Sequence, residues 1–380
     1  MFKVLIWDYT GISARWMERV ADKKNIEVVG TIAPQEPVPE SLLAKDAWDW
    51  LLIFEQGQRN FFEVTVRVLN LPLDRVIYAL DMNSWAQHPK AVYSLVRENS
   101  NIFLYLNFNL SRQLNDFVTC TVEGLNYVAT SKDNGLMRVM YTERVNFAAN
   151  EMKRFHALSK KYYGVDDSEG YFLDLGANIG TSCIYFVKKF APNLKILAFE
   201  PAVETFKMLR MNLIFNDLET QATAVNCGLG EKEDELKMHY RFSEDPGANS
   251  LVQYTEDTPF ETVKIIPIDS YLAENKIAAE EVKYMWIDTE GFEPQVLLGA
   301  KNLIRENPVL LFVEYNVQTW HKSGLMEQLM TLLARHYSHF ILFEFGKETL
   351  YPLEELSKLE PWPGSWTRGD VFFIKKGAID

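Results

Sequence analysis

A strand-like segment that ends in an acid and passes through a glycine turn into a helix-like segment occupies residues 172–182. It reads Phe-Leu-Asp-Leu-Gly-Ala-Asn-Ile-Gly-Thr-Ser, so that Asp174 precedes the turn and Gly176 and Gly180 lie within it. Glycines permit a tight turn and let a flat or extended ligand lie against the backbone. The segment therefore predicts an α/β sheet with a ligand site at the carboxyl end of this strand.

A second acid follows at the position where such a site needs one. The next strand-like segment, residues 195–199, is followed by Glu200 and Pro201, where an acid binds the two hydroxyls of a ribose. An NAD site usually has a third glycine and no acid before the first one, whereas Asp174 suits a cationic, amino-bearing ligand such as S-adenosylmethionine. The alternative is a glycine turn that only packs a helix against a strand.

A third group of acids follows the apolar run at residues 282–287. Asp288 and Glu290 lie two apart at the end of this run, so their side chains can point to one side. Glu293 falls in the first turn of the next helix, where an acid is favourable against the helix dipole in any case. The acids could orient and deprotonate a hydroxyl, or could hold a hard cation together with Glu314 at the end of the next strand.

Residues 1–120 contain an alternation of strand-like and helix-like segments of their own. Strands are expected at residues 2–7, 26–32, 50–54, 75–80 and 102–106, with a helix at residues 12–21. The pattern predicts a small Rossmann-like α/β domain. Its first turn has only Gly11 where a dinucleotide site carries three glycines, so we expect a role in docking, oligomerisation or substrate orientation.

Residues 121–169 connect this domain to a second one at residues 170–380. A hairpin is expected over residues 117–130 and a long helix over residues 144–163. The later alternation of strands and helices predicts a mainly parallel sheet covered on both faces. The last two strand-like segments, near residues 339–344 and 370–375, are expected to form an antiparallel pair at one edge of the sheet.

The charge of the chain narrows the class of partner. The 380 residues carry a formal net charge of −13, and the acidic excess falls in the second domain. Such a surface repels phosphate backbones and anionic membranes, so we expect no nucleic-acid partner and favour a neutral or cationic ligand. No apolar run reaches about 18 residues, so we expect no stable membrane insertion and a cytoplasmic protein. The three cysteines have no metal-site spacing and are expected to be buried thiols.

Residues 171–316, and less closely the residues up to 376, resemble the FkbM family of S-adenosylmethionine-dependent methyltransferases. The resemblance rests on motifs that occur in the family's order: Asp-Leu-Gly-Ala-Asn-Ile-Gly at 174–180, Phe-Glu-Pro at 199–201, Asn-Cys-Gly-Leu-Gly at 226–230, Asn-Ser-Leu at 249–251, Ile-Asp-Thr-Glu-Gly-Phe-Glu at 287–293, Leu-Leu-Gly-Ala at 297–300 and Val-Glu at 313–314. It implies a class I methyltransferase fold, with a seven-stranded sheet whose last strand is antiparallel. It also implies O-methylation of a hydroxyl on a sugar, glycan precursor or natural product.

The resemblance also implies a set of site residues. The glycine turn would surround the methionine part of the cofactor, Glu200 would hold the ribose, and residues 225–228 would lie against the adenine. The expected cofactor-binding residues are Asp174, Gly176, Ala177, Asn178, Gly180, Thr181, Glu200, Pro201, Asn226, Cys227, Gly228 and Asp288. The expected catalytic residues are Asp288, Glu290, Glu314 and His321.

The chain departs from the family pattern in two places. Thr289 and Phe292 replace a valine and an alanine, and Phe292 would narrow the acceptor pocket. The family often has a histidine soon after Val-Glu, whereas the nearest one here is His321, so the general base stays open among the acids, His321 and a metal-bound hydroxyl. Trp362 and Trp366 could form a stacking platform for a sugar or pack a proline-rich loop onto the sheet.

The expected acceptor is a small molecule or a carbohydrate, and the protein could be a homo-oligomer. Two other functions stay open: a non-catalytic module that keeps the cofactor fold for binding or assembly, and an N-methyltransferase. A nicotinamide-dependent oxidoreductase is disfavoured because the third glycine is absent.

Overall fold

The structure is a computed structural model of the chain. It describes residues 2–8, 26–33, 47–54, 62, 65–67, 69, 71, 75–78, 100–240, 246–252, 258–344, 347–361 and 369–379. The chain divides into two compact units, Met1–Asn115 and Asp116–Asp380. The predictions for Gly11, the helix at residues 12–21, Trp362 and Trp366 lie outside the described residues.

The first unit contains a four-stranded parallel sheet and one described long helix. The strands lie in the order β2 (Ile26–Ile32), β1 (Phe2–Asp8), β3 (Trp50–Phe54) and β4 (Val76–Tyr78). The rings of Trp7 and Phe62 meet edge to face at 5.2 Å in its core. The predicted strand at residues 102–106 is wrong, because these residues belong to helix α5 (Ser100–Leu114). A short apolar run does not by itself separate a strand from part of a helix.

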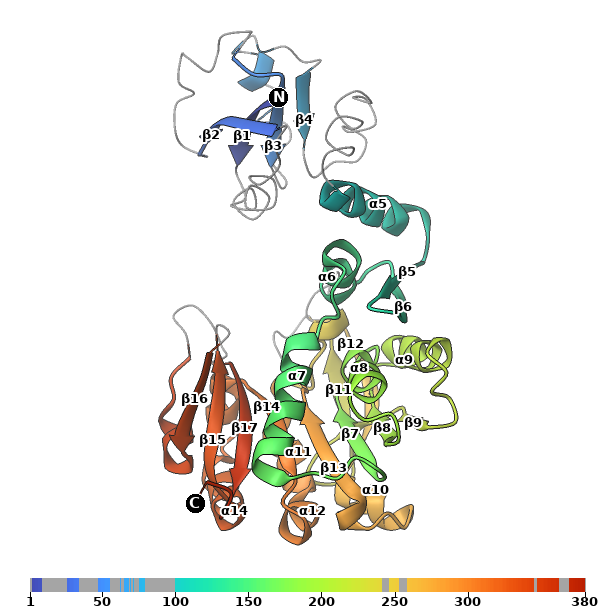
Figure 1. Ribbon diagram of the computed structural model, residues 1–380, viewed down its shortest axis with the longest axis vertical. Coiled ribbons are helices and arrows are strands. Elements are labelled where there is room, and N and C mark those ends of the chain that lie inside the picture. The colour runs from blue at the N-terminus through green and yellow to red at the C-terminus, as the bar shows by residue number, and fades with distance from the viewer. Residues whose placement is uncertain are drawn as a thin grey trace. The chain divides into compact units, whose positions relative to one another are not determined.

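The second unit is built around a mixed sheet of eight strands (Figure 1). In sheet order these are β16 (Lys347–Pro352), β15 (Tyr337–Glu344), β17 (Gly369–Lys375), β14 (Leu310–Tyr315), β13 (Val282–Ile287), β7 (Tyr171–Leu175), β8 (Lys195–Phe199) and β9 (Ala222–Val225). The strands from β14 to β9 are parallel, and the three at the other edge are antiparallel.

The predicted count of seven strands is wrong by one. The additional strand is β16, which pairs with β15 as a hairpin at the edge of the sheet. Most of its side chains are exposed on both faces, so its sequence lacks the alternation of apolar and polar residues that marks a half-buried strand.

The helices of the second unit follow the predicted alternation, with three corrections. The predicted helix at 144–163 begins at Ala149, ends as a π-helical turn (η3, Ser159–Tyr163) and is preceded by a helix that was not predicted, α6. After β13 the chain forms two short helices, α11 and α12, which meet at Ala300. The helices are α6 (Leu136–Glu143), α7 (Ala149–Leu158), α8 (Thr181–Lys189), α9 (Val203–Phe215), α10 (Ile268–Glu274), α11 (Glu293–Gly299), α12 (Lys301–Glu306), α13 (Val317–Lys322) and α14 (Met326–His336).

Two smaller β structures accompany the main sheet. The predicted hairpin is confirmed as β5 (Phe117–Val122) and β6 (Leu125–Thr130), and it is tied to α9 by Asn212, whose side-chain oxygen accepts from the Val128 N–H at 2.7 Å. A three-stranded sheet of β10 (Gly228–Leu229), β12 (Phe260–Ile266) and β11 (Asp234–His239) was not predicted. All three cysteines are buried free thiols, as predicted.

The two faces of the main sheet bury different side chains. On one face, Phe155 of α7 packs against the rings of Trp286, Phe312 and Phe372 at centroid distances of 5.6, 6.4 and 6.0 Å. The residues between these rings along each strand point to the other face, where they pack with aliphatic residues of α10, α11, α12 and α14. Among the described residues, no helix is long and apolar enough to cross a membrane.

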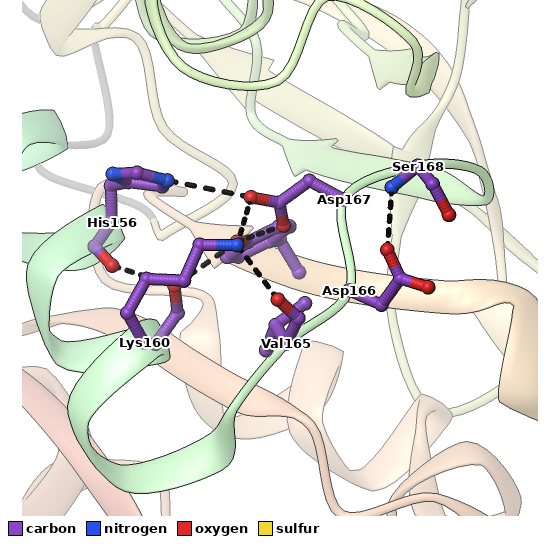
Figure 2. A network of polar contacts seen from close by, with 8 residues as sticks. His156, Lys160, Val165, Asp166, Asp167 and Ser168 are labelled. Carbon is purple, nitrogen blue, oxygen red and sulfur yellow. Dashed lines mark hydrogen bonds and ion pairs between the residues drawn. The ribbon is translucent and has the colours of Figure 1, made fainter.

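A polar cluster fixes the C-terminal end of α7 to the sheet (Figure 2). We call it the Asp167 clamp. The Asp167 carboxylate accepts from the Tyr284 hydroxyl at 2.5 Å, pairs with Lys160 at 2.5 Å and lies 3.4 Å from His156 Nε2. Ser159 joins the Tyr284 hydroxyl at 3.0 Å. Because Lys160 and His156 follow one another along α7 and η3, the clamp sets the position of this helix against β13.

Candidate functional site

A cavity of about 520 Å³ opens at the carboxyl ends of the parallel strands in the second unit. Most of the predicted site residues line it: Gly176, Ala177, Asn178, Thr181, Glu200, Pro201, Cys227, Gly228, Asp288, Glu290 and Glu314. Asp174, Gly180, Asn226 and His321 are not among its lining residues. The sheet thus brings the glycine turn, Glu200 and the later acids to one cavity.

The glycines of the turn are required by contacts within the protein. Gly176 has φ +95°, and a Cβ there would lie 1.8 Å from the backbone oxygen of Asp288. Gly180 has φ +88°, and a Cβ there would lie 2.8 Å from Leu209 Cδ1. Any side chain at Gly176 would push the ends of β7 and β13 apart, while Gly180 allows α8 to approach α9.

Backbone N–H groups hold Glu200 in place. Its Oε2 accepts from the Asn178 N–H at 2.9 Å, and its Oε1 accepts from the Ala202 N–H at 2.8 Å. Burial raises the pKa of Glu200 to about 7, although both hydrogen bonds act to lower it. Asn226 supports the same corner, because its side-chain amide donates to the backbone oxygens of Glu200 and Pro201 at 2.9 Å.

Asp174 lies beneath the cavity and is fully buried. Its Oδ2 accepts from the Cys183 N–H in the first turn of α8 at 3.2 Å, while its Oδ1 has no hydrogen-bond partner within the described ranges. Burial raises the pKa of this carboxyl to about 6. Asp174 therefore joins the end of β7 to the start of α8 from below the glycine turn.

Three carboxylates lie side by side across three neighbouring strands, and we call them the acid row. Glu314 on β14 is directly opposite Asp370 on β17. Asp288 follows Ile287, which pairs with Val313, so Asp288 lies next to Glu314. Each acid is two residues along its strand from an aromatic residue on the same face, and these residues are Trp286, Phe312 and Phe372. The rings of Trp286 and Phe312 stack at 3.3 Å and, with the acid row, line the cavity.

The acids raise one another's pKa. Burial and the charges of Glu293 and Asp174 raise the pKa of Asp288 to about 7. Burial and the charge of Asp288 hold the pKa values of Glu314 and Asp370 well above their usual range. Glu151 of α7 also acts on Asp370, because it lies one turn before Phe155, which packs on the neighbouring aromatic rings. Four carboxylates therefore share this end of the cavity.

Glu290, Glu293 and His321, three further residues considered in the sequence, have different surroundings. Glu293 is fully buried, and its carboxylate accepts from the N–H groups of Thr289 and Gly291 and from the indole of Trp320, so it holds the loop in shape. Glu290 lines the cavity with φ +53°, and its backbone oxygen accepts from the Ser250 hydroxyl at 2.7 Å. His321 lies on α13 and is exposed.

Sequence reasoning did not single out several residues that line the cavity. Four such residues are Asp370 of β17, Glu151 of α7, Arg138 of α6 and Asn249 of the segment between β11 and β12. Asp370 could have been predicted from the sequence, because it is an acid next to an apolar run. Asp288 and Glu314 were predicted from the same pattern. Glu151 carried none, because the sequence does not say which side of α7 faces the sheet.

A family model described as the methyltransferase FkbM domain matches residues 174–340. Methyltransferase sdnD from Sordaria araneosa is 30% identical over 193 residues, which cover 44% of this chain and 72% of the relative. The chain belongs to the FkbM methyltransferase family. The matched region extends from Asp174 to Phe340 and includes the glycine turn, Glu200 and two members of the acid row.

Two further relatives of this FkbM-family chain differ in coverage. Methyltransferase 1 from Beauveria bassiana (strain ARSEF 2860) is 29% identical over 153 residues, which cover 35% of this chain and 59% of the relative. A crystal structure of methyltransferase FkbM from Methylobacillus flagellatus KT is 16% identical, with a TM-score of 0.37, covering 98% of this chain and 90% of that one. A TM-score of this size adds nothing on the fold.

The family and enzyme class predicted from the motifs are confirmed, and the chain is an S-adenosylmethionine-dependent methyltransferase. In the part of the chain that the structure describes, no group of three or more His, Cys, Asp or Glu side chains is arranged to hold a metal ion.

Proposed function

We propose that this enzyme transfers a methyl group from S-adenosylmethionine to a hydroxyl group on a sugar, a glycan precursor or another natural product. The observation that carries the proposal is the meeting of the glycine turn and Glu200 with the acid row in one cavity. The cofactor supplies an electrophilic methyl group on a positively charged sulfur. An acidic cavity with a carboxylate at the ribose position fits such a molecule.

The proposed cofactor site follows the predicted residues, with two changes of role. Glu200 would bind the ribose, residues 176–178 and Thr181 the methionine part, and Cys227 and Gly228 the adenine. Asp174 does not line the cavity, so we assign it the positioning of the glycine turn through Cys183. Asn226 would position Glu200 and Pro201 in the same way.

We assign the proton transfer to Asp288. A hydroxyl is a poor nucleophile until its proton is removed, and a base works best when its pKa lies near the working pH. Asp288, with a pKa of about 7, meets this condition. The hydroxyl oxygen forms the new bond to the methyl carbon, the carbon–sulfur bond breaks with its electron pair going to sulfur, and the proton goes to the Asp288 carboxylate. Burial and the nearby charges of Glu293 and Asp174 make Asp288 a stronger base than a free carboxylate.

Calorimetric titration tests the proposed cofactor site directly. We expect S-adenosylmethionine and S-adenosylhomocysteine to bind at micromolar concentrations, with NADH not binding, and Glu200→Gln to weaken both. A valine at Gly176 would be a poor negative control, because its Cβ would meet the backbone of Asp288. Folded protein that binds neither sulfur ligand would contradict the proposal and favour a non-catalytic module.

The acid row gives one reason to keep nitrogen as a second candidate acceptor, because carboxylates attract amines. Transfer of a labelled methyl group, followed by mass spectrometry of the product, separates an ether from an N-methyl amine. An N-methylated product would overturn the assignment to a hydroxyl.

A further inference from the structure

The cavity has more negative charge than the cofactor can balance. Six acids line it, and Arg138 is the one cationic side chain among its lining residues in the described part of the chain. S-adenosylmethionine carries a sulfonium, an ammonium and a carboxylate, so it brings a single net positive charge. Unbalanced charge in a buried site is costly unless it is paired or neutralised. These acids must therefore either keep their protons, which their raised pKa values favour, or be paired with a cation other than the cofactor.

The excess lies on the side away from the glycine turn. Gly176, Asp288, Glu314 and Asp370 occupy successive positions across β7, β13, β14 and β17. With strands about 4.8 Å apart, Asp370 lies about 14 Å along the sheet from Gly176. Glu151 acts on Asp370 from α7. The far end of the acid row thus belongs to the space left for the acceptor.

Side-chain oxygens of the cavity also lack donors. Asn249 lines the cavity with 7% of its surface exposed, and its Oδ1 has no hydrogen-bond partner among the residues that the structure describes. Glu314 Oε2 is in the same condition. The segment that carries Asn249 is joined to the loop after β13, because the hydroxyl of the adjacent Ser250 donates to the backbone oxygen of Glu290. Buried polar atoms of folded proteins are nearly always paired, so these oxygens point to a ligand rich in hydrogen-bond donors.

We propose that the methyl acceptor carries an ammonium group, and that Glu314, Asp370 and Glu151 bind this group while the acceptor's hydroxyl lies nearer Asp288. The proposal rests on the proposed function and narrows its substrate to amino sugars and other amino alcohols. An ammonium has three N–H donors and a full positive charge. It can therefore donate to the unpaired oxygens and also balance the negative charge of the acids. Held in this form, its nitrogen has no free lone pair and is not itself methylated.

A matched pair of probes tests the ammonium directly. We would titrate enzyme saturated with S-adenosylhomocysteine with glucosamine and N-acetylglucosamine, and with trans-2-aminocyclohexanol and its N-acetyl derivative. Acetylation removes the charge and keeps the hydroxyls. In at least one pair we expect the amine to bind tenfold or more tightly than its acetylated partner, which corresponds to about 1.4 kcal/mol.

Two variants assign the preference to the acid row. Asp370→Asn and Glu151→Gln should each reduce the preference for the amine severalfold and leave affinity for S-adenosylhomocysteine unchanged. Asp217→Asn, at an exposed position with φ +55° that asparagine tolerates, is the matched control. If one variant fails to fold, the other still decides the question.

The outcomes separate this proposal from the proposed function. Equal binding of the two members of both pairs, or binding of neither amine by enzyme that binds S-adenosylhomocysteine, overturns the ammonium site and leaves methyl transfer intact. Equal binding would mean that the acids are protonated and neutral and that they bind the hydroxyl groups of the acceptor. Failure to bind S-adenosylhomocysteine in folded protein would contradict the proposed function itself. A preference that survives both variants also overturns the assignment to the acid row.

Discussion

The two ends of the cavity hold their acids in different ways. At the glycine turn, both oxygens of Glu200 accept backbone N–H groups, and Asp174 accepts a third from Cys183. At the acid row, Glu314 has an oxygen without a partner in the described part of the chain, and burial together with the charges of neighbouring acids raises its pKa. The proposed cofactor end is therefore organised by the chain itself, whereas at the proposed acceptor end the repulsion between acids is relieved only by a ligand or a proton. Substitutions should act on cofactor binding at one end and on chemistry and stability at the other.

The largest effect is expected from Asp288→Asn. The amide keeps the size of the side chain and cannot accept the proton, so turnover should fall by about 100-fold or more. Affinity for S-adenosylhomocysteine, measured by calorimetry, should stay within about twofold, because the turn and Glu200 are untouched. Glu290→Gln is expected to act in the same direction. Normal turnover in both variants, with Asp217→Asn as the control, would remove these carboxylates from the mechanism.

The next largest effect is expected at the cofactor end, from Glu200→Gln. One oxygen becomes an amide nitrogen, which must then face the N–H of Asn178 or Ala202. The substitution also takes a charged acceptor away from the ribose hydroxyls, and a hydrogen bond to a charged group contributes about 1.5–3 kcal/mol, so Kd for S-adenosylhomocysteine should rise by about 10-fold or more. The exposed Glu204→Gln on α9 is the matched control. Unchanged Kd would show that the backbone bonds of Glu200 are dispensable.

The pH dependence of turnover should be set by ionisation of Asp288 in the acid row. Asp288 accepts a proton only when it is ionised, so kcat/KM should rise as the pH passes through about 7 and then level off. Because the pKa of Glu200 is also raised to about 7, cofactor affinity should rise over the same range, so the profile is measured at saturating cofactor. A flat profile between pH 6 and pH 8 at constant folded protein would argue against Asp288 as the base.

The smallest expected effect is on stability, from Glu314→Gln. The folded protein raises the pKa of Glu314, so the native state keeps a proton that the unfolded chain releases. Stability is therefore lost as the pH rises above the ordinary carboxyl range. The glutamine should raise Tm by a few degrees at pH 8 and by less at pH 5. Glu219→Gln, at an exposed residue after α9, should change neither value. A lower Tm at pH 8 would mean that Glu314 is paired favourably.

The sequence predicted the parts of the fold that short-range patterns encode. The segment from β7 through the turn to α8 agrees with the structure within a residue, because an apolar strand, two glycines and a helix pattern lie next to one another. The hairpin at 117–130 was also predicted correctly. The exposed strand β16 and the helix α5 were missed. The sequence of β16 lacks the alternation of apolar and polar residues typical of a strand, and the apolar run in α5 hides the spacing typical of a helix.

The site was predictable where each residue ends its own strand. Glu200, Asp288 and Glu314 all follow or close apolar runs, so their shared edge could be inferred. The pairing of Asp370 with Glu314 depends on the antiparallel return of β17 between β14 and β15. The position of Glu151 depends on which side of α7 meets the sheet. Both are set by contacts between distant parts of the chain.

The Asp167 clamp bears on how the choice of methyl acceptor could change during evolution. The clamp ties one end of this helix to β13 at Tyr284, and the other end brings Glu151 to the cavity. All of α6 and α7 precede β7 in the chain, so they lie outside the region that carries the cofactor motifs. Substitutions in residues 136–151 can therefore change the side of the cavity proposed to bind the acceptor. The clamp would still hold α7 in its position against β13. A new acceptor could be recruited through this segment with the methyl-donor site left as it was.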